Sequence, residues 1–135
     1  QERGCPVILH TKGQEKEIGE IISDYSIPII IHWYSSQKYL DLYLKRDCYF
    51  TVGPDVLKNK AVQHVVKDVA LNRLFVETDG TNAIEWAIGR AVSPRKLPEI
   101  LLRSIDCISN LKGIDADIVQ KEIRKNIKVF DLFNP

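Results

Sequence analysis

Hydrophobic residues in this 135-residue chain gather in short runs that end in polar residues or glycine. Three of these runs, Pro6–His10, Ile27–His32 and Leu74–Asp79, end in a histidine or an aspartate, and a fourth run ends at Gly53. Short apolar runs bounded by polar or turn residues are typical of buried strands. The strand ends are 22, 21 and 26 residues apart, which leaves room each time for one strand, one helix and two short loops. The pattern therefore predicts a parallel α/β protein.

Stretches with helical periodicity separate these runs. The sequence predicts helices over Gln14–Tyr25, from Ser35 or Ser36 to about Lys45, from Pro54 to Ala70, from Pro98 through Ile108 and from Asp115 to Val129, with Phe130 and Phe133 as a tail. Apolar residues recur there every three or four positions, as on one face of a helix. The segment Gly80–Pro98 contains Gly89 and Pro94 and is expected to be an irregular, exposed loop.

The polar residues that end the apolar runs are candidate metal ligands. The carboxyl ends of parallel strands form one rim, so His10, His32 and Asp79 are expected to meet there. Because side chains alternate along a strand, Glu77 shares the face of Asp79. Alternatively, the histidines form hydrogen bonds with partners in the core or in the loops, and Asp79 caps the next segment. The agreement of three strand ends favours a metal site.

Four segments, PVILHTK, IPIIIHWYSS, YFTVG and LFVETDG, occur in the order found in a known family. They resemble the second half of the TatD-related metal-dependent deoxyribonucleases, which carry PVxxHxR, H-C-F-S-G, a Phe-Tyr strand ending in Gly, and L-L-x-E-T-D-A-P. The resemblance runs from about Pro6 to Phe130. It implies a TIM-type (β/α)8 barrel of the metal-dependent hydrolase superfamily, of which residues 1–135 supply about strands 5 to 8. Periodicity alone allows an open doubly wound sheet as readily.

The resemblance also implies a role for each candidate ligand. His10 and His32 match the two histidines that bind a second metal ion. Asp79 matches the aspartate that holds the first ion and orients or deprotonates the attacking water. Imidazole nitrogens suit zinc and manganese, and carboxylate oxygens suit magnesium and manganese. The expected cofactors are therefore divalent metal ions (Mg, Mn or Zn), two of them in an intact barrel, and the expected reaction is hydrolysis of phosphodiester bonds in DNA.

Further residues near the strand ends are candidates for supporting roles. Glu77 either orients a metal ligand or is a polar group satisfied by neighbouring backbone. Lys12 matches the basic residue of the H-x-R motif and meets a substrate phosphate, or is a solvated loop lysine. Ser35 matches the serine of H-C-F-S-G. Trp33 and Tyr34 replace Cys-Phe, and either ring could stack on an unpaired base, although rim packing is favoured for Tyr34.

Composition narrows the class of protein without naming a substrate. The chain is 44% hydrophobic and 27% charged, and its lack of a long apolar run or a signal-like start predicts a cytoplasmic protein with no membrane segment. A net charge of +1 excludes a broadly basic surface for binding nucleic acid. Contact with DNA would therefore have to come from groups on the rim formed by the strand ends. The chain has no C-x-x-C motif of the kind found in zinc knuckles. Its three cysteines, Cys5, Cys48 and Cys107, are interpreted as reduced core residues.

The length of the chain bears on its activity. A complete barrel needs roughly 250 residues. This chain has 135 residues, starts with Gln1 and contains no methionine, which predicts a fragment. The missing amino-terminal half, with the family's H-x-H pair and bridging Glu, is expected from the same gene or another chain. Without it the chain is expected to be neither stable nor active.

Departures from the family pattern leave a second hypothesis open. The family's R-N-E-P motif falls on Ala91–Pro94, where its Arg, Asn and Glu are absent. Divergence of this substrate loop is compatible with a catalytically impaired binding subunit of a larger assembly. An H-x-H pair and a Glu in the missing half would favour the enzyme.

Overall fold

The predicted strands form one parallel sheet in the computed structural model, which describes residues 5–131. The strands are β1 (Val7–His10), β2 (Ile29–His32), β3 (Tyr49–Val52) and β4 (Leu74–Val76), and they lie in the order β1-β2-β3-β4. The α-helices are α1 (Glu15–Ile22), α2 (Leu40–Lys45), α3 (Lys60–Asp68), α4 (Gly80–Ile88), α5 (Leu97–Lys112) and α6 (Ala116–Asp131). Short 3-10 helices cover Pro54–Leu57, Leu71–Arg73 and Pro94–Lys96. The parallel α/β prediction is confirmed.

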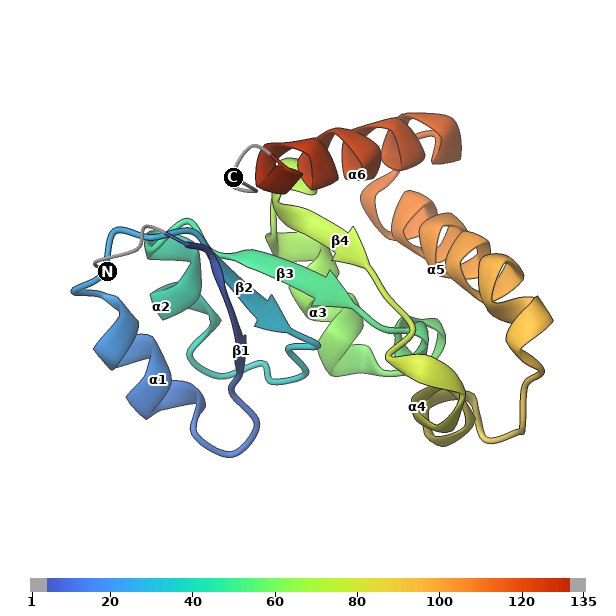
Figure 1. Ribbon diagram of the computed structural model, residues 1–135, viewed down its shortest axis with the longest axis horizontal. Helices are drawn as coiled ribbons and strands as arrows, with labels where there is room; N and C mark the ends of the chain where they lie inside the picture. Colours follow the sequence, from blue (N-terminus) through green and yellow to red (C-terminus); the bar gives the residue numbers. More distant parts are fainter. Residues whose placement is uncertain (1–4, 132–135) are drawn as a thin grey trace.

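The strand register brings the carboxyl ends of the strands together along one edge of the sheet. His10 pairs with His32 across β1 and β2, and Val52 pairs with Val76 across β3 and β4. Each strand neighbours the next one in the sequence, so the loops that follow all four strands emerge on the same side (Figure 1). This arrangement places the predicted ligands on a common rim.

The two faces of the sheet differ in how well they are covered. Ile31 and Phe50 point to the face that packs against helices, and both side chains are fully buried. In Figure 1, α3 lies behind the sheet, and α5 and α6 lie beside β4. On the opposite face, Ile8 is 63% exposed. The hydrophobic core of the described residues therefore lies on one side of the sheet.

The second predicted helix starts later than the sequence indicated. It begins at Leu40, so a cap at Ser35 or Ser36 is wrong. Tyr39, directly before the helix, has a left-handed backbone with φ of 62°. The Ser36 hydroxyl instead accepts a hydrogen bond from the backbone N–H of Lys38 at 3.1 Å, within the loop. The Ser36 hydroxyl is thus engaged in a turn that precedes the helix.

The third predicted helix is divided into two elements. A 3-10 turn covers Pro54–Leu57, and α3 follows only at Lys60. Asn59 separates them, and its side-chain oxygen accepts a hydrogen bond from the backbone N–H of Ala61 at 3.0 Å. This N-terminal cap explains why a second helix starts there.

The expectation of a continuous irregular loop over Gly80–Pro98 is wrong in its first half. Residues 80–88 form α4, which buries Ile84 and Ala87, and only residues 89–93 lack regular structure before the 3-10 turn at residues 94–96. Gly89 ends the helix with φ of 80°, a conformation that glycine adopts readily. The glycine read as a loop signal is therefore the C-terminal stop of a helix.

Other expectations have mixed outcomes. The Asp115 cap of the last helix is confirmed, because its carboxylate accepts a hydrogen bond from the backbone N–H of Asp117 at 2.9 Å. Phe133 lies outside the described residues. Cys48 is buried as expected, whereas Cys5 is exposed, so reading Cys5 as a core residue is wrong. None of the helices within residues 5–131 has the length and apolar character needed to cross a membrane.

Candidate metal centre

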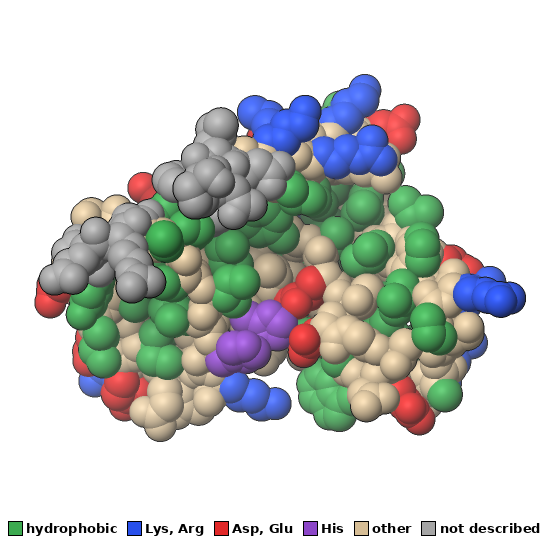
Figure 2. Space-filling model, in the orientation of Figure 1, with side chains coloured by type: hydrophobic (Ala, Val, Ile, Leu, Met, Phe, Trp, Pro, Cys, Tyr) green, Lys and Arg blue, Asp and Glu red, His purple; other side chains and the backbone are tan. Residues whose placement is uncertain are grey.

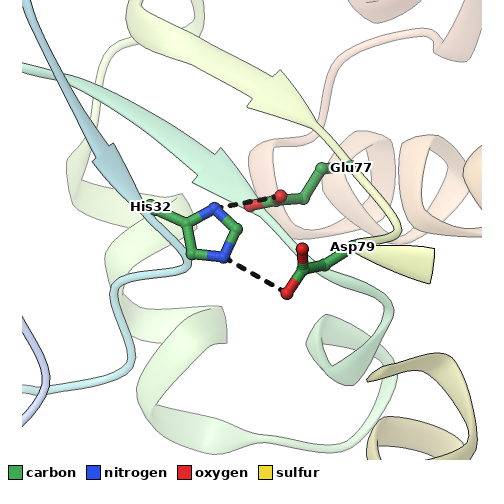
Figure 3. A group of neighbouring side chains, drawn as sticks. All are labelled: His32, Glu77 and Asp79. Carbon is green, nitrogen blue, oxygen red and sulfur yellow. Dashed lines mark ion pairs between the residues drawn. The ribbon is translucent and has the colours of Figure 1, made fainter. Parts of the chain in front are cut away.

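The side chain of His32 lies between two carboxylates at the rim of the sheet (Figure 3). Its Nδ1 atom is 3.1 Å from Oε2 of Glu77, and its Nε2 atom is 3.6 Å from Oδ2 of Asp79. One ligand atom from each of the three residues lies within 4.8 Å of the others. His32 ends β2, whereas both carboxylates follow β4, so the group depends on the fold of the sheet.

The backbone after β4 directs both carboxylates toward the same point. Glu77 remains tied to the sheet through its backbone N–H, which donates to the carbonyl oxygen of Val52 at 3.1 Å. Asp79 has a left-handed backbone, with φ of 51°, at the residue preceding α4. Its side chain makes no capping hydrogen bond to that helix. The alternative in which Asp79 serves as a helix cap therefore does not match the structure.

Thr51 of β3 links Glu77 to the neighbouring loop. Its hydroxyl donates to Oε1 of Glu77 and accepts a hydrogen bond from the backbone N–H of Trp33 at 2.9 Å. Burial raises the pKa of Glu77, and Asp79 raises it further, while the Thr51 hydroxyl and His32 act in the opposite direction. The side-chain contacts of Glu77 thus run to Thr51 and His32, so its carboxylate is well placed to orient a metal ligand.

His10 lies on the same rim but outside this group of three. Its ring centroid is 4.2 Å from that of His32, with the two rings tilted by 40°. Both rings line a pocket together with Asp79. The structure thus brings His10, His32 and Asp79 to one place, while Glu77, and not His10, completes the tight group of ligand atoms among the described residues.

The pocket beside these ligands has a volume of about 280 Å³ and opens to solvent. Figure 2 shows histidine and acidic side chains facing each other at this hollow. Lys12 and Ser35 line it, as do two tryptophans, Trp33 and Trp86. Of the residues predicted to have supporting roles, Lys12, Ser35 and Trp33 therefore border the pocket, whereas Glu77 and Tyr34 do not line it.

Trp33 forms a fixed wall of the pocket. Its indole N–H donates to Oδ1 of Asp55 at 2.6 Å, and Asn59 donates to the other oxygen of that carboxylate at 2.9 Å. Asp55 is buried, and burial raises its pKa, although the bonds from Asn59 and Trp33 oppose the shift. The ring also covers Gly53, where an added Cβ would lie only 2.1 Å from Cε2 of Trp33.

Tyr34 has the packing role expected for it. The side chain is 2% exposed, and its ring lies 5.1 Å from Tyr43 and 6.0 Å from Phe50, measured between centroids. Its hydroxyl donates to the carbonyl oxygen of Lys38 at 2.6 Å. Tyr34 therefore stabilises the loop after β2 and does not face the pocket.

The donor set suits a divalent cation. Two carboxylates and one imidazole provide the mixed oxygen and nitrogen ligands that Mg²⁺, Mn²⁺ and Zn²⁺ accept in different proportions. Glu77 already holds Nδ1 of His32, which leaves Nε2 on the side of Asp79. An ion held by these residues would lie beside an open pocket, where a second molecule has access to it.

Several residues of the site escaped the sequence analysis. No sequence pattern marks Trp86 or Asp55, and the segment YFTVG marks Thr51 only as part of a strand. Alternation along β3 does place Thr51 on the face opposite to the buried Phe50, which was an available signal. Trp86 follows Asp79 by two helical turns, but this spacing has meaning only once residues 80–88 are known to be helical.

A parallel α/β sheet with histidine and carboxylate side chains at its strand ends is an arrangement found in the class of metal-dependent hydrolases. Within that class the chain belongs to the TatD related DNase family, whose sequence model matches residues 1–131. The resemblance carried by the four motifs is thereby confirmed.

A sequence relative agrees with this assignment, and two solved structures share the fold. An uncharacterized metal-dependent hydrolase from Haemophilus influenzae is 28% identical over 128 residues, which cover 93% of this chain and 49% of the relative. The crystal structure of an uncharacterized amidohydrolase from Saccharomyces cerevisiae superimposes with a TM-score of 0.71 at 14% identity, over 95% of this chain and 54% of that protein. A TatD family hydrolase from Entamoeba histolytica gives 0.67 at 13% identity, over 93% and 50%. The chain spans about half the length of these relatives.

Proposed function

We propose that the protein containing this chain is a metal-dependent hydrolase that cleaves phosphodiester bonds in DNA. The observation that carries the proposal is the group formed by His32, Glu77 and Asp79 beside an open pocket. The name of the family adds DNA as the substrate. In this proposal the chain supplies strands 5 to 8 of a (β/α)8 barrel.

The chemistry requires a water, a phosphodiester and a base. His32, Glu77 and Asp79 would hold a divalent cation, which would polarise a phosphate oxygen and bring the pKa of a water toward about 7. Asp79 is the base, because its side chain is 54% exposed and faces the pocket. The water oxygen forms a bond to phosphorus while Asp79 takes its proton. The ester P–O bond breaks, and the leaving oxygen receives a proton from solvent.

Other side chains position these groups. Glu77 holds the His32 ring through Nδ1, so that Nε2 stays available on the pocket side. His10 stands against the His32 ring and provides a further imidazole for a second ion in the intact barrel. Lys12, which lines the pocket, offers an ammonium to a phosphate, and Ser35 offers a hydroxyl.

We further propose that strands outside this chain complete the barrel. Among the described residues, β1 and β4 are the edges of the sheet, and Ile8 on β1 is largely exposed on the uncovered face. Edges and apolar faces of this kind are normally covered. An upstream segment of the same gene or a second chain would provide the cover, together with the remaining metal ligands. The chain alone would then be inactive.

A second function is favoured by one observation. Residues 91–94, which stand where the family has Arg-Asn-Glu-Pro, present no arginine, asparagine or glutamate, and most of this segment is exposed. A rim that has lost these polar groups suits a binding subunit that keeps the fold without turnover. The experiment below separates this function from hydrolysis.

Hydrolysis of labelled DNA oligonucleotides by the full-length protein tests the proposal. Turnover should require Mg²⁺, Mn²⁺ or Zn²⁺ and stop with a chelator. Asp79→Ala and His32→Ala should each lower the rate about 100-fold or more. His64→Ala is the matched control, because His64 lies outside the pocket and contacts Asp68 at 3.4 Å on α3. Absence of metal-dependent cleavage in the wild type would favour the binding subunit.

A further inference from the structure

We infer that Asp55 is a positioning residue for the metal centre, and that it acts by holding Trp33 in the conformation that keeps the His32 ring in place. The inference rests on the metal site of the proposed function, but it does not depend on DNA being the substrate. Asp55 lies in the 3-10 turn after β3 and does not line the pocket. Any effect of this side chain on the site therefore has to pass through its neighbours.

Trp33 has a backbone conformation that residues with a bulky side chain rarely adopt. It directly follows His32, the last residue of β2, and its φ is 45°. In this left-handed region the Cβ crowds the main chain, so surrounding contacts have to hold the residue there. Outliers of this kind cluster at functional sites. The turn after His32 is thus held by its neighbours and not by the preference of Trp33 itself.

Two hydrogen bonds hold Trp33 in this conformation. Its backbone N–H donates to the Thr51 hydroxyl at 2.9 Å, and its indole N–H donates to Oδ1 of Asp55 at 2.6 Å. The second bond is of the stronger kind, because its acceptor is a carboxylate. The indole also lies directly against Gly53, which limits its movement on that side.

Asp55 is itself firmly held. The residue is 2% exposed, and its second carboxylate oxygen accepts a hydrogen bond from the Asn59 amide at 2.9 Å. Its backbone carbonyl accepts from the N–H groups of Lys58 and Asn59, at 2.9 and 2.7 Å. Burying a carboxylate costs stability unless hydrogen-bond donors satisfy it, and Trp33 and Asn59 supply such donors. Asp55 and Trp33 thus hold each other in place.

The backbone of Trp33 is linked to the His32 ring by a closed set of contacts. Thr51, which accepts from the Trp33 N–H, donates to Glu77, and Glu77 lies 3.1 Å from Nδ1 of His32. The peptide bond between His32 and Trp33 closes the set. The Trp33 indole also meets the imidazole at its edge, with centroids 6.2 Å apart and planes at 67°. A shift of Trp33 therefore reaches His32 both through hydrogen bonds and through direct packing.

Loss of the bond to Asp55 would let Trp33 relax toward a negative φ. Its N–H would then turn away from Thr51, and the Thr51 hydroxyl would be free to rotate away from Glu77. Glu77 would no longer fix one orientation of the imidazole, so His32 would more often present a proton, instead of a lone pair, toward Asp79. The affinity for a metal ion should fall although no ligand has changed.

Calorimetric titration of Mn²⁺ into the full-length protein tests the inference in a double-mutant cycle. Asp55→Ala and Trp33→Phe remove the same hydrogen bond from opposite sides, and Trp33→Phe keeps an aromatic ring at the rim. The control for general destabilisation is Val66→Ala, which opens a cavity at a fully buried position of α3. The tautomer of His32 is read in the metal-free protein from its ring ¹⁵N shifts at pH 8, with His32→Ala used to assign the signals.

The expected losses are equal and do not add. Asp55→Ala and Trp33→Phe should each bind Mn²⁺ about 10-fold more weakly, at the lower end of the range for groups that support metal ligands. The double variant should bind no more weakly than the weaker single variant, because the second substitution finds the bond already broken. Both single variants should raise the share of His32 with its proton on Nε2. Val66→Ala should unfold more easily but bind Mn²⁺ as the wild type does.

Wild-type affinity in Trp33→Phe, losses that add in the double variant, or an equal loss in Val66→Ala would overturn the inference. If Asp55→Ala does not fold, Trp33→Phe decides alone, since it removes the same bond. A full-length wild type that binds no Mn²⁺ would instead defeat the proposed hydrolysis. The His32 tautomer would then decide the inference, and an unchanged tautomer in Trp33→Phe would refute it.

Discussion

Glu77 holds Nδ1 of His32 at 3.1 Å, and this contact decides which nitrogen of the ring faces the pocket. A neutral imidazole that donates its Nδ1 proton to a carboxylate keeps its lone pair on Nε2, where a metal ion can accept it. The opposite tautomer would direct a proton at the site. The carboxylate is itself held by the Thr51 hydroxyl, so the orientation of His32 depends on three neighbouring strand ends.

The first prediction concerns this carboxylate. Glu77→Gln should weaken Mn²⁺ binding about 10- to 100-fold, because the amide still accepts from His32 but has lost the charge that supports the ion. Isothermal titration of the full-length protein measures the change. Glu85→Gln is the control, since it removes one exposed carboxylate from α4 outside the pocket lining. Equal affinity of the two variants would show that Glu77 has no part in metal binding.

The second prediction concerns the contact between Trp33 and Gly53. An alanine at position 53 would place its Cβ 2.1 Å from Cε2 of Trp33, and the ring cannot move away without losing its bond to Asp55. Gly53→Ala should therefore lower the free energy of unfolding by about 1 to 3 kcal/mol. Urea denaturation measures this loss.

A double variant separates this clash from other effects of alanine at position 53. Gly53 has an ordinary extended backbone, with φ of −82°, so alanine causes no strain in the main chain. In a Trp33→Leu background the substitution Gly53→Ala should cost clearly less than in the wild type. An equal cost in both backgrounds would contradict the proposed clash.

The third prediction concerns stability at alkaline pH. Burial, with a contribution from Glu15, raises the pKa of Tyr43 from 10.0 to about 12. Because the pKa in the folded state lies above the unfolded value, the contribution of the phenol is complete below pH 10 and is lost as the pH rises toward 12. At pH 11 the loss is about 1 kcal/mol. Tyr43→Phe should abolish this part of the alkaline destabilisation.

The same substitution should lower stability at neutral pH. The Tyr43 hydroxyl donates to the carbonyl oxygen of Glu15 at 2.5 Å, and its removal leaves that acceptor without this donor at a cost of about 1 kcal/mol. Urea denaturation at pH 8, 10 and 11 measures both effects. Tyr25→Phe, at a 43% exposed position, is the control. If Tyr43→Phe and wild type lose stability in parallel above pH 10, another group is responsible.

The sequence predicted the sheet and its rim because both follow from local patterns. Each apolar run is long enough for one buried strand, and the polar residues that end the runs, His10 and His32, are the last residues of their strands. The identity of the tightest ligand group did not follow from these patterns. Glu77 joins it through contacts with Thr51 and His32, which belong to two other strands and come together only in the folded sheet.

The chemistry of the pocket wall was hidden for a different reason. Gly89 and Pro94 suggested a loop. Gly89 instead follows the last residue of α4, and this helix is only nine residues long, so its periodicity is short. Once that helix was missed, Trp86 could not be related to Asp79. Asp55 was hidden because a buried carboxylate is recognised by its partners, here Trp33 and Asn59, and not by its place in the sequence.

The last prediction concerns the chain without any further strands. In a polypeptide of residues 1–135, the described part has two open sheet edges at β1 and β4 and an uncovered face with Ile8 63% exposed. Because such surfaces pair with other chains, it should self-associate, melt without a cooperative transition and fail to hydrolyse DNA with Mn²⁺. Sedimentation velocity, thermal melting and a hydrolysis assay check these points, with the full-length protein as the reference. A monomer that melts cooperatively and shows metal-dependent turnover abolished by Asp79→Ala would refute the need for completing strands.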